Sequence, residues 1–140
     1  MATLFRAVGA IVAGMLVAFI LVVAVELFSA VVHPLPPDFA GTTEEMCQHV
    51  ERYPHWVLAV VVPAWAGTAF AGTWIAGRLG NRGSALFVGL LLLAALIFNI
   101  AMLPYPIWFK IASLMVIACA IVTGFCLSSR RGVAALNTPE

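Results

Sequence analysis

The sequence predicts an all-α integral membrane protein built as a four-helix bundle. Of its 140 residues, 64% are hydrophobic and only 9% are charged, and the mean hydropathy is +1.09. A soluble domain is usually about half apolar and about a quarter charged. The composition therefore excludes a soluble globular protein, a disordered chain and a disulfide-rich secreted scaffold. The net charge of +1 provides no electrostatic attraction for nucleic acid, so we expect no nucleic-acid partner.

Four apolar stretches are long enough to cross a bilayer, which takes about 20 helical residues for about 30 Å of hydrocarbon. In lipid the backbone must satisfy its own hydrogen bonds, so we expect each stretch to be a helix. The first stretch is too long for a cleaved signal peptide and contains Glu26, so we expect it to remain as a span. The predicted spans, which form one membrane domain over 1–132 followed by a short polar tail over 133–140, are about 7–32, 56–76, 84–103 and 107–128.

Basic residues near the ends of the spans predict the orientation of the chain, because they are enriched on the cytoplasmic side. Two of them, Arg52 and Lys110, fall on one side. The rest fall on the other side, which we therefore expect to be cytoplasmic together with both termini: Arg6, Arg78, Arg82, Arg130 and Arg131.

The loop over 33–55 then faces outward and has a helix signal of its own. Thr42 followed by Glu45 is typical of a capping box. Apolar side chains recur at helical spacing after it, which predicts a short amphipathic helix over about 43–53, resting on the outer membrane surface. Its polar face is expected to carry Glu45 and His49 as a surface pair.

Small residues recur every fourth position on three of the spans, and such stripes let helix backbones approach closely in lipid. One interpretation is packing within a single bundle, and the other is an interface with a second copy or a partner protein. The stripes are Ala10, Gly14 and Ala18; Thr68, Gly72 and Ala76; and Ala120, Gly124 and Ser128.

Glu26 is the most informative single residue, because it lies about six residues, roughly 9 Å, below the outer end of the first span. A carboxylate at that depth is costly, so we expect it to face the bundle interior with a partner or to be protonated. The topology brings the other polar candidates to the same end, and together they predict a polar ligand site: Glu26, His33, His55, Asn99 and Lys110. The alternative is a structural bond from Glu26 to Asn99 or Lys110.

Other chemistry has little support in the sequence. There is no paired-cysteine motif, no His pair at metal-binding spacing and no histidine inside a span, so we expect no metal and no cofactor. There is also no nucleophilic triad, phosphate loop or carboxylate dyad, which argues against an enzyme. An intramembrane acid–base enzyme using Glu26 or His33 is the remaining enzymatic alternative.

Four features in order resemble those of a group of small bacterial four-span membrane proteins without an assigned function. Glu26 is followed by His33-Pro-Leu-Pro, and a Pro63-x-Trp65-x-Gly stretch lies in the second span. Asn99 is then followed by Leu103-Pro-Tyr-Pro-x-Trp108. In that group the last turn often reads Pro-His-Pro, whereas Tyr105 stands here in the middle. The resemblance implies a multi-pass protein of the bacterial inner membrane and implies nothing about a substrate.

Besides the intramembrane enzyme, the sequence leaves two functions open. The first is a non-enzymatic protein that acts by helix–helix association, as a homo-oligomer or an accessory subunit of a membrane partner. The second is a small transporter or ligand-binding protein with a polar site around Glu26, Asn99 and Lys110. In both, the lipid bilayer is the immediate surrounding.

Overall fold

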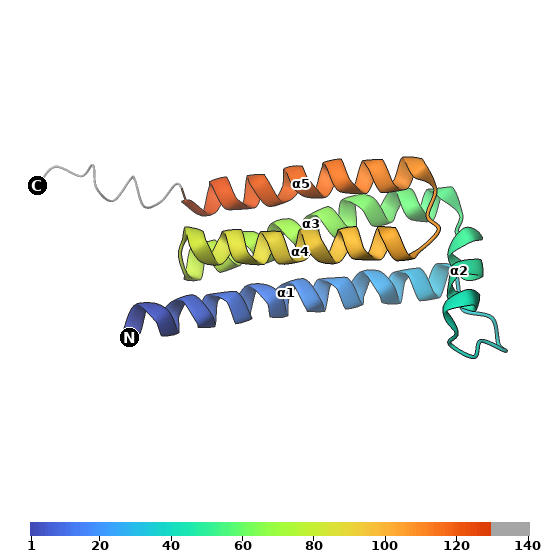
Figure 1. The fold of residues 1–140 in the computed structure, drawn as a ribbon, viewed down its shortest axis with the longest axis horizontal. Coiled ribbons are helices and arrows are strands. Elements are labelled where there is room, and N and C mark those ends of the chain that lie inside the picture. Colours follow the sequence, from blue (N-terminus) through green and yellow to red (C-terminus); the bar gives the residue numbers. More distant parts are fainter. Residues whose placement is uncertain (130–140) are drawn as a thin grey trace, which may run out of the picture.

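The computed structural model describes residues 1–129 and consists there of five helices without a strand (Figure 1). Four are long and apolar enough to cross a membrane, as the sequence predicts. Arg130, Arg131 and the polar tail, which entered the predictions, lie outside the described residues. The helices are α1 (Ala2–Val32), α2 (Thr43–Glu51), α3 (His55–Leu79), α4 (Arg82–Met102) and α5 (Ile107–Ser129).

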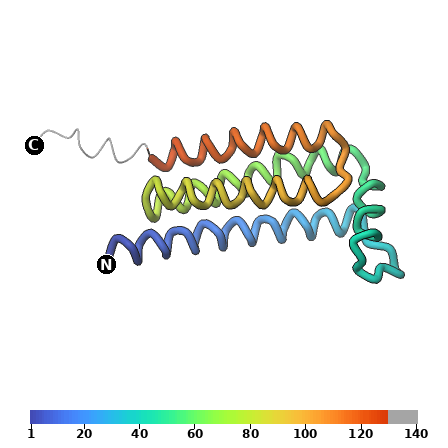
Figure 2. Tube along the Cα trace, in the orientation of Figure 1, coloured from blue at the N-terminus to red at the C-terminus, as the bar shows by residue number. Residues whose placement is uncertain are grey.

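The long helices run antiparallel to their neighbours in the chain, and α2 lies across one end of the bundle (Figure 2). That end, with the turn over 103–106, is called the α2 end here, and the opposite end, where α1 begins, is called the terminal end. Helix α3 is central because it contacts α1, α4 and α5. Within the described residues α1 contacts α3 and α4, and it does not contact α5.

The small-residue stripes pack inside this bundle. A Cβ added to Gly14 would lie 2.6 Å from the carbonyl oxygen of Gly72 and 2.9 Å from the Cβ of Ala76. On the other side of α3, a Cβ added to Gly124 would lie 2.9 Å from the carbonyl oxygen of Phe70. Only glycine permits such close approach of two helix backbones. The first interpretation of the stripes, packing within one bundle, is therefore confirmed.

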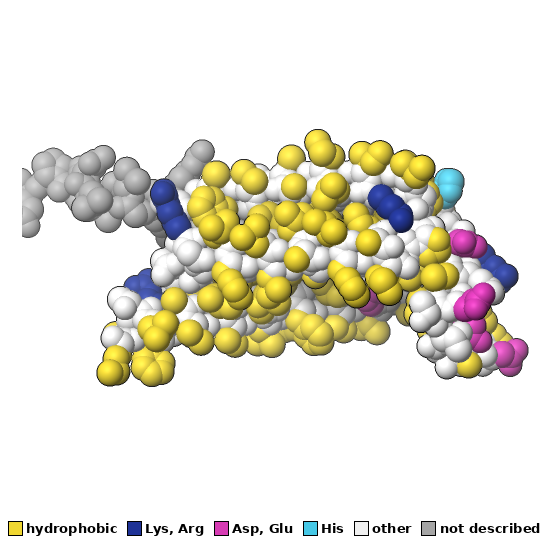
Figure 3. Space-filling model, in the orientation of Figure 1, with side chains coloured by type: hydrophobic (Ala, Val, Ile, Leu, Met, Phe, Trp, Pro, Cys, Tyr) yellow, Lys and Arg dark blue, Asp and Glu magenta, His cyan; other side chains and the backbone are white. Residues whose placement is uncertain are grey.

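The apolar core runs along α3, and large apolar side chains also cover the outside of the long helices (Figure 3). At the α2 end, Phe109 of α5 is fully buried against Val57 and Leu58 of α3. Further along, Leu96 of α4 and Ile117 of α5 are buried beside α3. Exposed apolar side chains along the length of the bundle fit a lipid surrounding, in which they remain out of water.

Helix α2 begins with the predicted capping box. The Glu45 N–H donates to Thr42 Oγ1 at 3.2 Å, and the Thr42 N–H donates to Glu45 Oε2 at 3.2 Å. Gly41 precedes it with a φ of 80°, a conformation that glycine adopts readily. The helix ends at Glu51, two residues earlier than predicted, and only Arg52 follows it as a turn.

The predicted polar face of α2 is wrong at His49. This side chain is only 8% exposed, and it stacks on His33 instead of forming a surface pair with Glu45. The Glu45 carboxylate is used in the cap, where it also accepts a hydrogen bond from the Ala40 N–H. Helical spacing alone assigned His49 to the polar face because imidazole counts as polar, although its ring packs well against other rings.

Candidate functional site

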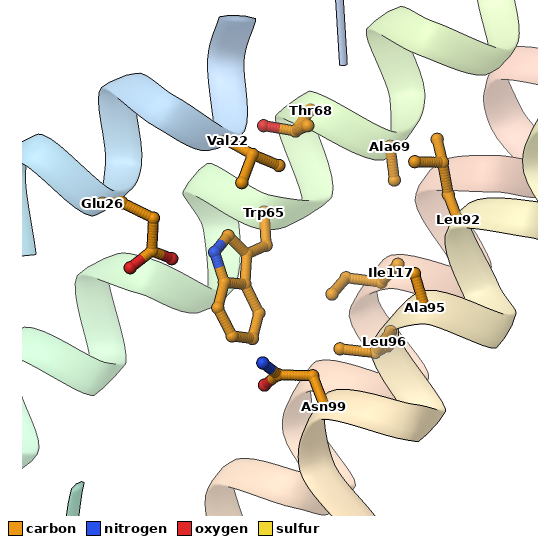
Figure 4. Close-up of a pocket in the computed structure, with 10 residues that line it drawn as sticks. All are labelled: Val22, Glu26, Trp65, Thr68, Ala69, Leu92, Ala95, Leu96, Asn99 and Ile117. Atoms are coloured by element: carbon orange, nitrogen blue, oxygen red, sulfur yellow. The ribbon is translucent and has the colours of Figure 1, made fainter. Parts of the chain in front are cut away.

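A pocket of about 200 Å³ lies between α1 and α4, with α3 as its floor. It reaches from the middle of the bundle into the half nearer α2. Most of its wall is apolar, and two strongly polar side chains, Glu26 and Asn99, contribute to it. The residues that line it are Val22, Glu26, Trp65, Thr68, Ala69, Leu92, Ala95, Leu96, Asn99 and Ile117 (Figure 4).

Helical spacing accounts for which side chains line the walls. Val22 and Glu26 are four residues apart on α1, so they share one face of that helix. Leu92, Leu96 and Asn99 follow at steps of four and three on α4 and share the facing side. The two polar groups therefore enter the pocket from opposite helices because each continues an otherwise apolar stripe.

Trp65 lies between these two polar side chains. The Glu26 carboxylate points toward the indole from the side of the ring nitrogen, and the Asn99 amide approaches it from the other side (Figure 4). Asn99 Oδ1 is buried and has no hydrogen-bond partner within the described residues. An amide that is buried without a partner leaves hydrogen-bonding capacity unused inside the pocket.

Glu26 was expected to face the interior of the bundle with a partner, or to be protonated, and the structure shows no partner for it within the described residues. Its side chain lines the pocket but is exposed. Within residues 1–129, no hydrogen bond and no ion pair joins it to Asn99 or Lys110. The carboxylate thus lies at the rim of the pocket, where a molecule from the surroundings can reach it.

The other predicted site residues lie elsewhere. His55 stacks edge-on against Trp108, with ring centroids 5.9 Å apart, and it is exposed. Lys110 is half-buried near the start of α5 and does not line the pocket. His33 belongs to a separate cluster with α2. Of the five predicted residues, the structure brings only Glu26 and Asn99 to one pocket.

The cluster around His33 joins the loop after α1 to α2. The rings of His33 and His49 stack with centroids 4.3 Å apart, and Tyr53 lies 4.5 Å from His33 and 5.4 Å from His49. His33 Nε2 is 3.2 Å from the carbonyl oxygen of His49. Burial, and then the charges of His33 and Arg52, hold the pKa of His49 below its ordinary value.

Three aromatic residues near the pocket did not stand out in the sequence as site residues. Trp65 lies 5.7 Å from the ring of Phe109, which lies 4.7 Å from the ring of Tyr105. Burial, and then the negative charge of Glu26, raise the pKa of Tyr105. By sequence, Tyr105 is interpreted as an ordinary interface anchor, and Tyr53 as an apolar position of the amphipathic helix in the outer loop.

Burial also raises the pKa of Tyr53, and the charge of Glu26 adds to that rise against the opposing effect of the Ser29 hydroxyl. Both phenols therefore remain protonated at neutral pH. Neither phenol lines the pocket, where Trp65 is the aromatic neighbour of the carboxylate.

Within residues 1–129, no group of three or more His, Cys, Asp or Glu side chains is arranged to hold a metal ion. The cysteines at 47, 119 and 126 are not paired with one another. Comparisons with protein-family models, with curated proteins and with solved structures found no match to this chain. The resemblance described above therefore stays a prediction.

Proposed function

We propose that this chain is a small ligand-binding membrane protein that takes an apolar or amphiphilic molecule from the bilayer into the pocket between α1 and α4. The observation that carries the proposal is the position of Glu26 and Asn99 on opposite walls of one largely apolar pocket. Ligand sites are typically apolar concavities with a few convergent polar groups that fix orientation. An ionisable residue inside a membrane span is also a usual mark of a functional site.

Function through helix–helix association has less support. The small-residue stripes that favoured it are occupied inside the bundle, as Gly14 against Gly72 and Gly124 against Phe70 show. The remaining exposed surface of the long helices is apolar, which lipid alone accounts for. A homo-oligomer or a membrane partner would have to use that surface.

We further propose that the α2 end faces outward from a bacterial inner membrane. Three arginines lie at the terminal end: Arg6 near the start of α1, Arg78 near the end of α3 and Arg82 at the start of α4. Arg6 Nε donates to the carbonyl oxygen of Leu79 there, at 2.8 Å. Four acidic residues lie in the loop and helix at the α2 end. This distribution supports the orientation that follows from the enrichment of basic residues on the cytoplasmic side. The pocket would then open in the outer half of the bilayer.

The test is to ask whether the protein keeps an amphiphile when it is extracted from its own membrane. Native mass spectrometry of the wild-type chain is expected to show a bound species of lipid-like mass. Ala95→Phe places a ring in the pocket wall and is expected to remove that species. Ala94→Phe adds the same ring to the neighbouring exposed position outside the pocket, so it is the matched control and should keep the bound species.

Two results would contradict the proposal. One is a wild-type chain that carries no bound amphiphile after gentle extraction. The other is equal retention by the Ala95→Phe and Ala94→Phe proteins, because binding would then not depend on the space between α1 and α4.

A further inference from the structure

The unbalanced charge of Glu26 defines the chemistry of the molecule that the pocket accepts. Within residues 1–129, no lysine or arginine lines the pocket, and no ion pair involves this carboxylate. Lys110, which lies near the start of α5, is outside the lining. A carboxylate on a membrane helix without a counter-charge is costly, and a cation that enters the pocket would remove that cost.

The Trp65 ring at the pocket favours the same charge. It lies between Glu26 and Asn99 (Figure 4), and a cation over its face, away from the nitrogen edge that Glu26 approaches, would be attracted to it. An anion would meet the Glu26 carboxylate with no basic side chain in the lining to offset it, so the pocket disfavours it.

The rest of the pocket selects for an apolar body. Apart from Trp65 and Thr68, whose hydroxyl already donates to the carbonyl oxygen of Ala64, the other side chains of the lining are apolar and offer no hydrogen bond to a polar molecule. The volume of about 200 Å³ suits a compact headgroup with the first part of a chain. Because Glu26 is exposed at the rim, the remainder of a longer chain can extend into the surrounding lipid.

We propose that the pocket binds a lipophilic ammonium ion, with the ammonium group on the Glu26 carboxylate beside Trp65 and the apolar chain along α1 and α4. This inference rests on the proposed function and adds the class of ligand. A primary amine fits better than a neutral alcohol because its three N–H groups can donate to Glu26 and to other acceptors at the rim. The expected order of affinity is amine, then alcohol, then carboxylate.

The experiment compares three probes of equal chain length, namely nitroxide-labelled dodecylamine, dodecanol and dodecanoate. The protein carries Trp65 as its single tryptophan, with Trp56, Trp74 and Trp108 changed to Phe, and it is reconstituted in zwitterionic lipid nanodiscs. A bound nitroxide quenches Trp65, so quenching at matched membrane concentration reports occupancy. The amine is expected to bind at least about tenfold more tightly than the alcohol.

Three further variants test whether Glu26 is the source of this preference. Glu26→Gln should lose the preference for the amine while the alcohol still quenches Trp65, which also shows that the variant folds. Glu26→Asp keeps the charge and should keep the preference. Glu44→Gln removes an exposed acidic side chain of α2 outside the pocket and should change nothing.

Each alternative outcome is informative. Equal binding of amine and alcohol, or preference for the carboxylate, would overturn the cation inference while leaving the proposed ligand pocket in place. If the Glu26→Gln protein still prefers the amine, the preference comes from the charge of the membrane surface and not from Glu26. This result would also overturn the inference. Quenching by none of the probes above that of the Ala95→Phe protein would overturn the proposed function itself.

Discussion

Replacing Gly14 by valine tests whether α1 is held against α3 by direct backbone contact. The new Cβ would lie 2.6 Å from the carbonyl oxygen of Gly72, 2.9 Å from the Cβ of Ala76 and 3.3 Å from the backbone nitrogen of Ala76. Two of these three atoms belong to the backbone of α3 and cannot rotate away. We therefore expect α1 to be displaced from α3 by the substitution.

The expected cost can be worked out from a matched position. Inserting methyl groups into a packed interface usually costs about 1–3 kcal/mol. Because the neighbours of Gly14 are rigid backbone atoms, we expect Gly14→Val to cost about 3 kcal/mol. Gly9 lies on the same helix, and a Cβ there would meet nothing within 4 Å. Gly9→Val has the same change in helix propensity, so the difference between the two variants isolates the steric contact.

The assay is reversible unfolding in mixed micelles with increasing dodecyl sulfate, followed by circular dichroism and tryptophan fluorescence. Gly14→Val should shift the midpoint strongly, and Gly9→Val should stay within about 0.5 kcal/mol of the wild type. If both variants unfold at the same point, the close contact of α1 with Gly72 and Ala76 does not hold the bundle together, and the packing argument fails.

Three further changes address α2 and the core. Because the pKa of His49 is lowered by burial, the stability of the α2 end should fall as the pH drops below about 6.5 toward the lowered value, and His49→Gln should remove part of that slope in amide hydrogen exchange. Thr42→Ala breaks the capping box at a cost of about 1 kcal/mol, so exchange in the first turn of α2 should quicken about fivefold. Thr73 is fully buried with no hydrogen-bond partner for Oγ1 within the described residues, so Thr73→Val should be neutral or stabilise by about 1 kcal/mol in micelle unfolding.

Each of these has a result that would count against it. A pH profile that is identical in wild-type and His49→Gln proteins would remove the titration of His49 as its cause. Unchanged exchange after Thr42→Ala would mean that packing of α2, and not its cap, holds its first turn. A clear loss of stability in Thr73→Val would show that the hydroxyl has a partner. Thr68→Val is the comparison for Thr73→Val, because it removes a buried hydroxyl that does have a partner. Thr68 Oγ1 donates to the carbonyl oxygen of Ala64 at 3.1 Å.

The sequence predicts the fold well because membrane spans follow directly from runs of apolar residues. The predicted boundaries of the second and third spans differ from α3 and α4 by only a few residues. The first helix begins earlier, at Ala2, because Arg6 is accommodated by a hydrogen bond to the carbonyl oxygen of Leu79. A hydropathy pattern gives no information on such a contact between segments that are distant in the chain.

The candidate site was less predictable, because depth in the membrane does not specify direction around a helix. Glu26, Asn99 and Lys110 lie at similar predicted depth, but only Glu26 and Asn99 face the same pocket. Which polar residues share a pocket depends on whether α1 lies beside α4 or beside α5. The apolar pattern of the helices is too uniform to predict that arrangement. Trp65 enters the sequence analysis only through the resemblance and not as a site residue, since an aromatic residue in a span normally indicates only packing or anchoring.

The one-sided attachment of α1 has a mechanical consequence. Gly14 against Gly72 fixes α1 near its middle, and along the described residues α1 has no contact with α5. Beyond Gly14, Val25 and Val32 of α1 pack on the core cluster around Phe109, so the wall that presents Glu26 is held along its length. The distance between the two polar walls of the pocket therefore depends on the placement of this one helix against α3 and α4.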